Sequence, residues 1–326
     1  MRFKGVLTQR GLNELGRGFL PTLQRFGKTV VLVLGPEEVH LVSEGGMASD
    51  ADSTDGPFVC VRLGAPLVFD AAPLCQSKHN LNLIAFEFDL KLFERVMHGA
   101  ASNEAEGLEM KLSMRRVPNG EETQARPFLS FQQGGSISIT SELPISKPFP
   151  QAEVDHLIAL IRSDDVCPFY VDLMPAVANL NESLKRLKKL SQTCLVTLVK
   201  NGDAHFQAFR MQSGCTVGVE YRGLEVHPDG ERVADDRNVE AQQQPTGRLA
   251  AAKDLGMCSE LIVRAKHLTS AFGVCQYTRP AKLLCGANGD FLHFLYVYLD
   301  RAGGAVTDKE SMAIKIPCVQ DSSAGF

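Results

Sequence analysis

The clearest pattern of apolar and polar positions lies between residues 177 and 190. Four apolar side chains recur there at the spacing of one helix face: Val177, Leu180, Leu184 and Leu187. Three cations fall roughly opposite them: Lys185, Arg186 and Lys189. The pattern predicts an amphipathic helix whose apolar side meets a core and whose basic side stays in solvent.

The segment after this helix predicts a β-hairpin. Residues 193–199 form a β-branched apolar run, and residues 204–209 form the returning segment. Between them stands Asn201-Gly202, the strongest short-range hairpin signal. A strand that begins at Phe169 precedes the helix, so the unit is a strand, a basic amphipathic helix and a hairpin.

The same order of elements occurs in the first forty residues. Residues 2–8 predict a strand, residues 11–26 an amphipathic helix, and residues 29–34 and 38–42 a hairpin. The helix has an apolar face made of Leu12, Leu15, Phe19, Leu23 and Phe26. Its cations lie on the other face and its flank: Arg10, Arg17 and Arg25. Pro21 should kink this helix or start a new turn in it.

A second pair of segments extends the repetition. Residues 83–88 run into a short helix with Lys91 and Arg95 outward, and residues 260–265 run into a helix over 266–275 that begins with Lys266. The two copies match in pattern, although their identity is too low to count as a sequence repeat. They indicate an internal duplication.

The rest of the chain predicts antiparallel strands and polar connections. Strands are expected at 58–63, 67–69, 108–114, 128–131, 136–143, 215–221, 283–285, 291–299 and 312–318, and loops or turns at 44–56, 73–80, 117–126 and about 225–257. Residues 144–168 hold four prolines, which suits a linker over the surface, with a helical turn at 153–161. The predicted fold class is α+β, with domains at 1–146 and 168–326 joined by a connecting segment at 147–167.

Length and charge agree with two domains and set limits on their function. The 326 residues suffice for two domains of about 150 residues, each with its own core. No window of 18 apolar residues occurs and the chain begins directly with a strand, so we expect neither a membrane span nor a signal peptide. The net charge of −4 argues against general nucleic-acid affinity, yet cations gather on the four predicted helices.

The chemistry-bearing residues form no recognisable catalytic or metal-binding set. The nine cysteines are scattered singly and never occur as Cys-x-x-Cys, which indicates buried thiols in a reducing compartment. The eight histidines lack metal-ligand spacing, and the chain contains no phosphate-binding glycine loop and no nucleophile elbow. We therefore predict no catalytic residue, no metal and no cofactor, and hence a protein that is not an enzyme.

Several short motifs carry a resemblance to a known family. They are Met1-Arg-Phe-Lys-Gly-Val-Leu-Thr, Phe19-Leu-Pro-Thr-Leu, Arg126-Pro-Phe-Leu-Ser-Phe, Leu143-Pro-Ile-Ser-Lys-Pro-Phe and Asp236-Arg-Asn-Val-Glu. With the duplicated halves and the proline-rich connector, they make the chain resemble the hydroxyurea-sensitivity (Hus-type) subunit of the nine-one-one DNA-damage checkpoint clamp. That family is related to proliferating cell nuclear antigen.

The resemblance implies a DNA-clamp fold and a non-enzymatic function. The expected protein is one subunit of a 1:1:1 ring with two related clamp subunits, which a clamp loader places around double-stranded DNA at damage sites. There it supports checkpoint kinase signalling and tethers repair enzymes. It is expected in the nucleus and, before assembly, also in the cytoplasm. The alternative is a homotrimeric replicative processivity clamp, which differs by its mass in solution.

Three groups of site residues follow from the resemblance. The residues expected to line the DNA channel without reading sequence are Arg10, Arg17, Arg25, Lys91, Arg95, Lys185, Arg186, Lys189 and Lys266. Those expected on the strands that join neighbouring subunits are Ile137, Ile139 and Leu143 on one edge, and Val217, Val219 and Tyr221 on the other. Those expected to dock partner proteins along the connector are Ile145, Phe149 and Leu157, with the alternative that they only pin the connector to the sheet.

Overall fold

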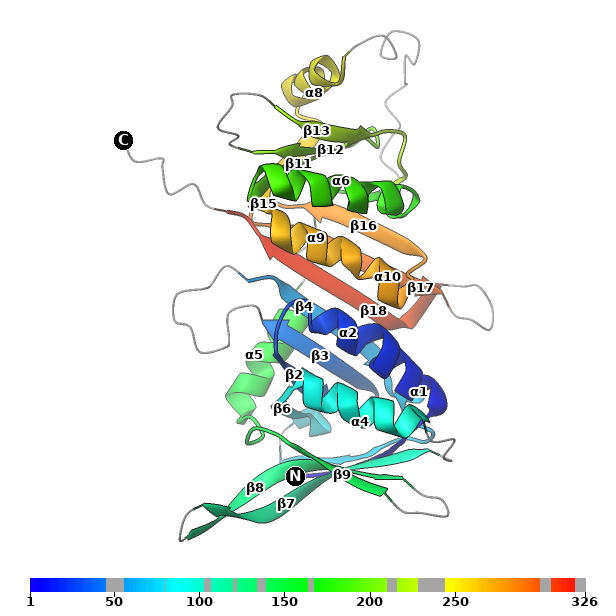
Figure 1. The fold of residues 1–326 in the computed structure, drawn as a ribbon, viewed down its shortest axis with the longest axis vertical. Coiled ribbons are helices and arrows are strands. Elements are labelled where there is room, and N and C mark those ends of the chain that lie inside the picture. Colours follow the sequence, from blue (N-terminus) through cyan, green and yellow to red (C-terminus); the bar gives the residue numbers. More distant parts are fainter. Residues whose placement is uncertain are drawn as a thin grey trace.

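The chain forms two halves of matching topology that lie end to end along one long axis (Figure 1). The computed structural model describes residues 1–44, 56–78, 80–102, 107–119, 122–133, 139–163, 167–209, 216–227, 244–299 and 306–319. Ile137, the motif at 236–240 and most of the loop predicted at 44–56 lie outside these described residues.

The first half runs from a central strand to a long hairpin. Its elements are β1 (Arg2–Leu7), α1 (Gln9–Asn13), the π-helix η1 (Glu14–Phe19), α2 (Leu20–Leu23), β2 (Thr29–Leu34), β3 (Glu38–Glu44), β4 (Phe58–Gly64), α3 (Ala65–Val68), β5 (Leu74–Gln76), the 3₁₀ turn η2 (Asn80–Asn82), β6 (Ile84–Asp89), α4 (Leu90–Ser102), β7 (Leu108–Asn119), β8 (Glu122–Gln133) and β9 (Ile139–Pro144). One helix, α5 (Gln151–Ile161), follows in the connector.

The second half repeats this order. Its elements are β10 (Tyr170–Asp172), the 3₁₀ turn η3 (Met174–Ala176), α6 (Val177–Leu190), β11 (Thr193–Val199), β12 (Ala204–Ala208), β13 (Gly218–Tyr221), β14 (Val226–His227), α8 (Pro245–Asp254), β15 (Cys258–Arg264), α9 (Ala265–Gly273), α10 (Cys275–Thr278), β16 (Lys282–Ala287), β17 (Phe291–Leu299) and β18 (Val306–Pro317).

Strand order shows the duplication most directly. The first half has a five-stranded set, β5-β1-β7-β8-β9, and a four-stranded set, β4-β3-β2-β6. The second half has β14-β10-β16-β17-β18 and β13-β12-β11-β15 in the same relative order. Strand β18 pairs with β4, from Glu310 opposite Leu63 to Lys315 opposite Phe58, so one nine-stranded antiparallel sheet crosses from half to half. The predicted α+β fold with duplicated halves is therefore confirmed.

The paired helices of both halves lie in one row on the same side of the sheets (Figure 1). Their apolar faces fill a single core, in which the predicted positions Leu12, Phe19, Leu184 and Phe272 are each less than 5% exposed. Burial of an aliphatic or aromatic side chain contributes about 1.5–3 kcal/mol, so this spacing of apolar residues is what holds each helix on the sheets. The predicted helix faces are confirmed.

Pro21 divides the first helix of the row into three short pieces. Proline has no N–H, so the carbonyl of Arg17 four residues earlier cannot accept the usual α-helical bond. The chain forms the π-helix η1 directly before this point, and Pro21 lies in the first turn of α2. The hydroxyl of Thr22 donates to the Gly18 carbonyl at 2.8 Å. The new turn predicted at Pro21 is confirmed.

The connector helix α5 covers the opposite side of the first half. Its Val154 and Leu157 are 1% exposed and pack on outward-facing residues of the strands, among them Val31, Val42 and Ala85. Strands β2 to β4 are therefore buried on both faces, which explains why β2 is a nearly continuous apolar run rather than an alternating one.

Four predictions about local structure were wrong. Residues 67–69 do not form a strand, because Pro66 suits the first turn of a helix and α3 forms there. The loop predicted at 73–80 contains β5, which pairs with β1. The turn predicted at 117–126 belongs mostly to the arms of β7 and β8, which stay paired although they are polar. The insertion predicted at 225–257 contains β14 and α8.

No helix in the described part of the chain is long and apolar enough to span a membrane. The eight cysteines in that part are free, and six of them are buried. Burial raises the pKa of the Cys60, Cys194 and Cys275 thiols to about 12, so these groups stay protonated and unreactive near neutral pH.

Candidate DNA-facing surface

The row of helices carries most of the predicted cations on its solvent side. In the first half Arg17 on η1 and Lys91 and Arg95 on α4 are exposed. Arg10 on α1 is only partly exposed, and its Nε atom is buried with no hydrogen-bond partner among the described residues. Three of these four guanidinium or ammonium groups can thus reach a polyanion that passes along the row, whereas Arg10 is partly held against the protein.

In the second half the exposed cations lie on α6 and at the start of α9. Lys185, Arg186, Lys189 and Lys266 are all exposed. Lys185 pairs with Glu182 at 2.6 Å, and the hydrogen bond from Lys185 lowers the pKa of that carboxyl. An exposed ion pair of this kind contributes little to stability and is easily exchanged for a contact with phosphate.

Lys188 is a cation that the sequence pattern did not single out. It lines a cavity of about 500 Å³ together with Arg264, Lys266, Gln192, Thr193 and Val319. The last turn of α6 and the first turn of α9 meet there, and the contact between two helices far apart in sequence is what gathers these cations. A sequence pattern that treats each helix separately contains no signal for it.

Arg25 was predicted as a channel residue, but the structure places it at the junction between the halves. Its guanidinium lies 5.8 Å from the centre of the Tyr277 ring on α10. A Cβ atom at Gly273 would lie 2.4 Å from an Arg25 nitrogen, so the absence of a side chain there lets the guanidinium pack flat on α9. Arg25 therefore joins the two halves by a cation–π contact, and this use limits its reach toward a duplex.

The two predicted interface strands are sheet edges at opposite ends of the molecule (Figure 1). Strand β9 ends the five-stranded sheet of the first half, and β13 ends the four-stranded sheet of the second. Ile139 and Val217 are exposed, at 44% and 39%. Leu143 is 1% exposed, so this side chain is unavailable to a neighbour, whereas Val219 and Tyr221 are half-buried against the core.

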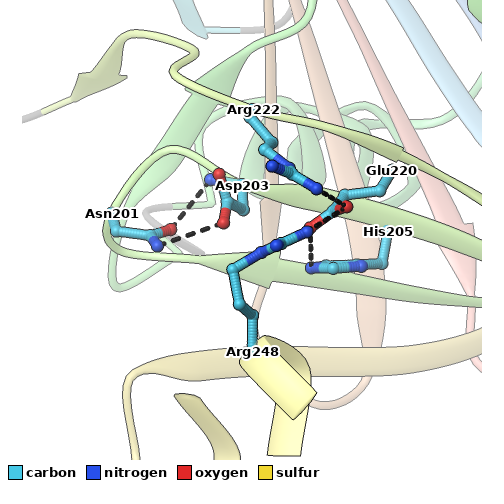
Figure 2. A network of polar contacts seen from close by, with 6 residues as sticks. All are labelled: Asn201, Asp203, His205, Glu220, Arg222 and Arg248. Carbon is cyan, nitrogen blue, oxygen red and sulfur yellow. Dashed lines mark hydrogen bonds and ion pairs between the residues drawn. The ribbon is translucent and has the colours of Figure 1, made fainter. Parts of the chain in front are cut away.

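A buried polar network holds α8 against the edge strand β13 (Figure 2). Nη2 of Arg248 on α8 lies 2.7 and 2.6 Å from the two carboxylate oxygens of Glu220 on β13. Arg222 reaches the same carboxylate at 2.9 Å, and His205 Nε2 lies 3.8 Å from it. Asn201 orders Asp203 beside them through two hydrogen bonds.

The charges in this network are balanced by the two arginines. Burial alone would raise the pKa of Glu220, but the hydrogen bonds from Arg248 and Arg222 outweigh it and keep that pKa below its ordinary value. Burial lowers the pKa of His205, so the imidazole is neutral near pH 7. Asp203, His205 and Glu220 form the one group in the described chain with metal-ligand geometry, and there Arg248 already occupies the Glu220 oxygens.

The connector places its three predicted docking residues differently. Ile145 is half-buried against the core and forms an isolated bridge with Phe88. Phe149 is half-buried, and its N–H donates to Ala85 at 2.8 Å. Leu157 lies beneath α5 and is 1% exposed. The prediction that Leu157 forms a wall of a docking site was therefore wrong, because the helix turns this side chain toward the sheet.

A cavity does exist beside the end of α5, at a place that the sequence did not indicate. It measures about 810 Å³ and is bordered by Ile158, Ile161 and Arg162 of the connector. Across from them lie the β2–β3 turn and residues 81–83, with His40 and Arg62 on neighbouring strands. The cavity arises where the helix crosses the sheet, a contact that the proline-rich sequence of the connector does not reveal.

Comparisons with known proteins agree on one fold. A family model described as Hus1-like protein matches residues 1–320. The crystal structure of PCNA from Thermococcus kodakaraensis is similar with a TM-score of 0.55 and 15% identity, over 97% of this chain and 100% of that one. Proliferating cellular nuclear antigen from Entamoeba histolytica has a TM-score of 0.57 and 9% identity, over 98% and 99% of the two chains.

A third similar structure is the PCNA2–PCNA3 complex from Sulfolobus tokodaii, with a TM-score of 0.54, 10% identity and coverage of 98% and 99%. No curated protein sequence matches the chain. The structural matches cover whole chains on both sides at identities of 15% or less, so they show a shared PCNA-like clamp fold.

Proposed function

Because the chain belongs to the Hus1-like protein family, we propose that it is a non-enzymatic subunit of a heterotrimeric checkpoint sliding clamp. The ring encircles double-stranded DNA at damage sites without sequence specificity, after a clamp loader has placed it there. It supports checkpoint kinase signalling and tethers repair enzymes, and it acts in the nucleus.

The observation that carries this proposal is the pairing of β18 with β4 inside the chain. By strand order, β9 occupies in the first half the place that β18 has in the second, and β13 occupies in the second half the place that β4 has in the first. The sheet that joins the two halves is therefore a template for the junction between chains. A β9 edge added to the β13 edge of a neighbour would form another nine-stranded sheet, and repeated head-to-tail addition can close a ring.

Hydrogen-bond alternation identifies the backbone groups available for such a junction. The Ala208 N–H donates to Val217, so Gly218 and Glu220 on β13 turn their N–H groups to the free edge. The Ile145 N–H donates to Pro127, so the outward positions on β9 are Thr140, Glu142 and Pro144. The edges are short, and neither carries a lysine within it, as a strand guarded against pairing often does.

Two different neighbours fit these edges better than a second copy of the chain. The carboxylates on the edges, Glu142 and Glu220, already pair with Arg115 and Arg248 of the same chain, so these two carboxylates are not left to attract a second copy of it. In the Sulfolobus structure PCNA2 is in complex with PCNA3. The expected state of the purified chain is a monomer that forms a 1:1:1 ring with two related subunits. A stable homotrimer at micromolar concentration would favour the alternative, a homotrimeric replicative clamp.

Retention on circular DNA tests the proposal. A ring assembled from this chain and two candidate clamp subunits should stay on circular duplex and slide off after linearisation. Replacing Lys185 and Lys189 by Glu should weaken duplex binding for all sequences and make the slope of log K against log salt shallower by about 0.9 for each lost phosphate contact. The matched control is K147E with R162E, which changes charge equally at two exposed connector residues. Equal effects from both pairs would contradict a channel formed by the helix row.

The connector supports the role in tethering. The cavity beside Ile161 and Arg162 is lined by residues of α5 on one side and of the β2–β3 turn on the other. Apolar residues and arginines there suit a partner peptide that carries both apolar and acidic side chains. Replacing Ile161 by Ser should weaken recruitment of a repair enzyme and leave the assembled ring intact, as judged by gel filtration of the mixture.

A further inference from the structure

A second cavity, of about 970 Å³, lies at the junction between the halves. We call it the junction groove. Its first wall is formed by Asn13, Glu14, Arg17 and Gly18, at the start of the row of helices, and its second by residues 276–281 at the end of α10. Tyr298, Leu299 and Glu310 form its floor. Helix α10 contacts η1 and α2 of the first half, and Figure 1 shows the orange α10 beside the blue α2. The groove therefore adjoins the row of basic helices.

The rim of the junction groove carries two arginines and an exposed aromatic ring. Arg17 and Arg279 are exposed, and the side chain of neither makes a hydrogen bond or ion pair within the described residues. Tyr277 is 44% exposed, and the Arg25 guanidinium lies over its ring. Cations that track a backbone, next to an aromatic ring on which a base can stack, are the groups with which proteins bind single-stranded nucleic acid.

The floor of the groove offers polar groups for a base edge. Tyr298 is 5% exposed, and its buried hydroxyl lies within reach of the Thr278 hydroxyl at the same cavity. Glu310 is 6% exposed and borders the same cavity, with Glu14 on the wall. Their carboxylates would repel a phosphate on the floor, so phosphate belongs at the arginine rim. The amino groups of adenine, cytosine and guanine, in contrast, can donate to these acceptors.

The backbone around the groove adopts two unusual conformations. The wall at 14–19 is a π-helix, a rare form that is frequently found at functional sites. Arg279 has φ +49° in the left-handed region at the C-terminal cap of α10, a position where glycine is the favoured residue. An arginine held in this conformation, with a side chain that is unpaired among the described residues, suits a role in ligand binding better than a role in the turn.

We propose that the junction groove binds an unpaired nucleotide of single-stranded DNA, with its phosphates at Arg17 and Arg279, its base stacked on Tyr277, and the base edge toward Tyr298. This inference rests on the proposed clamp function, because the groove then lies beside the duplex that the ring encircles. In a duplex the bases stay stacked inside the helix, so none of them can stack on the Tyr277 side chain in the groove. A single strand that continues from a duplex end has unpaired bases that can.

The test uses the purified full-length chain and fluorescence anisotropy with a short labelled oligonucleotide, single-stranded or as a duplex. Tyr277→Ala should lower single-strand affinity about tenfold, while Tyr277→Phe, which retains the ring, should not. Arg17→Gln should make the salt slope for the single strand shallower by about 0.7. The control K185Q with K189Q should reduce duplex binding more than single-strand binding.

Arg279→Gly separates a ligand-binding role from a structural one. Glycine suits the left-handed cap, so the variant should have an unchanged or higher melting temperature and yet bind the single strand more weakly. Unchanged single-strand affinity in Tyr277→Ala and Arg279→Gly would overturn the proposal, and so would an equal loss of duplex affinity in both. Neither result would alter retention of the assembled ring on circular duplex, which tests the proposed function separately.

Discussion

At the scale of single residues, Arg248 has the largest structural role that the sequence did not reveal. It is 8% exposed and carries the charge that neutralises Glu220, beside Asp203 and a neutral His205. The contact spans 28 positions and joins α8 to an edge strand. Strand β13 is expected to form a subunit junction. Arg248 therefore stabilises the strand of that junction without itself contacting the neighbouring subunit.

Replacing Arg248 by Met should destabilise the protein by about 2 kcal/mol, because it leaves the Glu220 carboxylate half-buried with only Arg222 as a cationic partner. Chemical denaturation measures the change. The matched variant Arg222→Gln removes an exposed arginine from the same carboxylate and should cost much less stability than Arg248→Met. Equal losses in the two variants would contradict a special role for the buried arginine.

His205 should make stability depend on pH. Its pKa is lowered by burial, even though the carboxylates of Glu220 and Asp203 face it, along with Arg248 and Arg222. A lowered folded-state pKa means that the unfolded chain binds a proton first. Its contribution is therefore complete above the unfolded pKa near 6.5 and is lost as pH falls through the folded value.

The experiment for His205 is urea denaturation of the protein and its His205→Asn variant between about pH 7.5 and pH 5. The native protein should lose more stability over this range than the variant. His40, whose pKa burial also lowers, is present in both proteins and cancels in the difference. Parallel pH profiles would show that His205 does not titrate with unfolding.

At the scale of elements, the connector helix α5 is a structural part of the first half. Leu157 is 1% exposed and packs on the outer face of the sheet. Leu157→Ala should therefore lower the free energy of unfolding by about 3 kcal/mol, the usual cost of truncating a buried leucine. His156→Ala, at the exposed neighbour, should change it by less than about 0.5 kcal/mol. A large loss of partner recruitment with unchanged stability would instead restore the predicted docking role of Leu157.

Elements with a strong periodic spacing of apolar residues could be predicted from the sequence. Elements that form only because of a neighbouring element in the fold could not. The apolar stripe from Val177 to Leu187 determines α6 and its buried face without any other information. In contrast, β5 exists only because β1 provides an edge, and α3 because Pro66 favours a first helical turn over a strand. The basic side chains could be assigned to the solvent face of each helix. Arg25, however, reaches across the junction between the halves, because Tyr277 on α10 lies close to it.

At the scale of the whole molecule, the two sheet edges make a testable prediction about assembly. Thr140 on β9 turns its N–H outward, as Pro144 does with its ring nitrogen. Thr140→Pro should therefore remove an inter-subunit hydrogen bond while leaving the pairing with β8 intact. Thr140→Val keeps the N–H and is the matched control.

Gel filtration of the variant chain with its two candidate partner subunits measures the effect. Thr140→Pro should prevent ring closure at one junction and leave a linear assembly, since the β13 edge is unaltered. The melting temperature of the isolated chain should stay close to that of Thr140→Val. Rings that form normally with Thr140→Pro would place the junction elsewhere.

The continuous nine-stranded sheet also has a mechanical consequence. Between the halves β18 and β4 are paired over residues 310–315, and the helices on both sides share one core. Between chains an edge as short as β13 is available. A force that bends an assembled ring would thus first distort the short strand pairings between chains, while each chain moves as a rigid body. A machine that opens the ring would then need to separate only one joint between chains, while the nine-stranded sheet inside each chain stays paired.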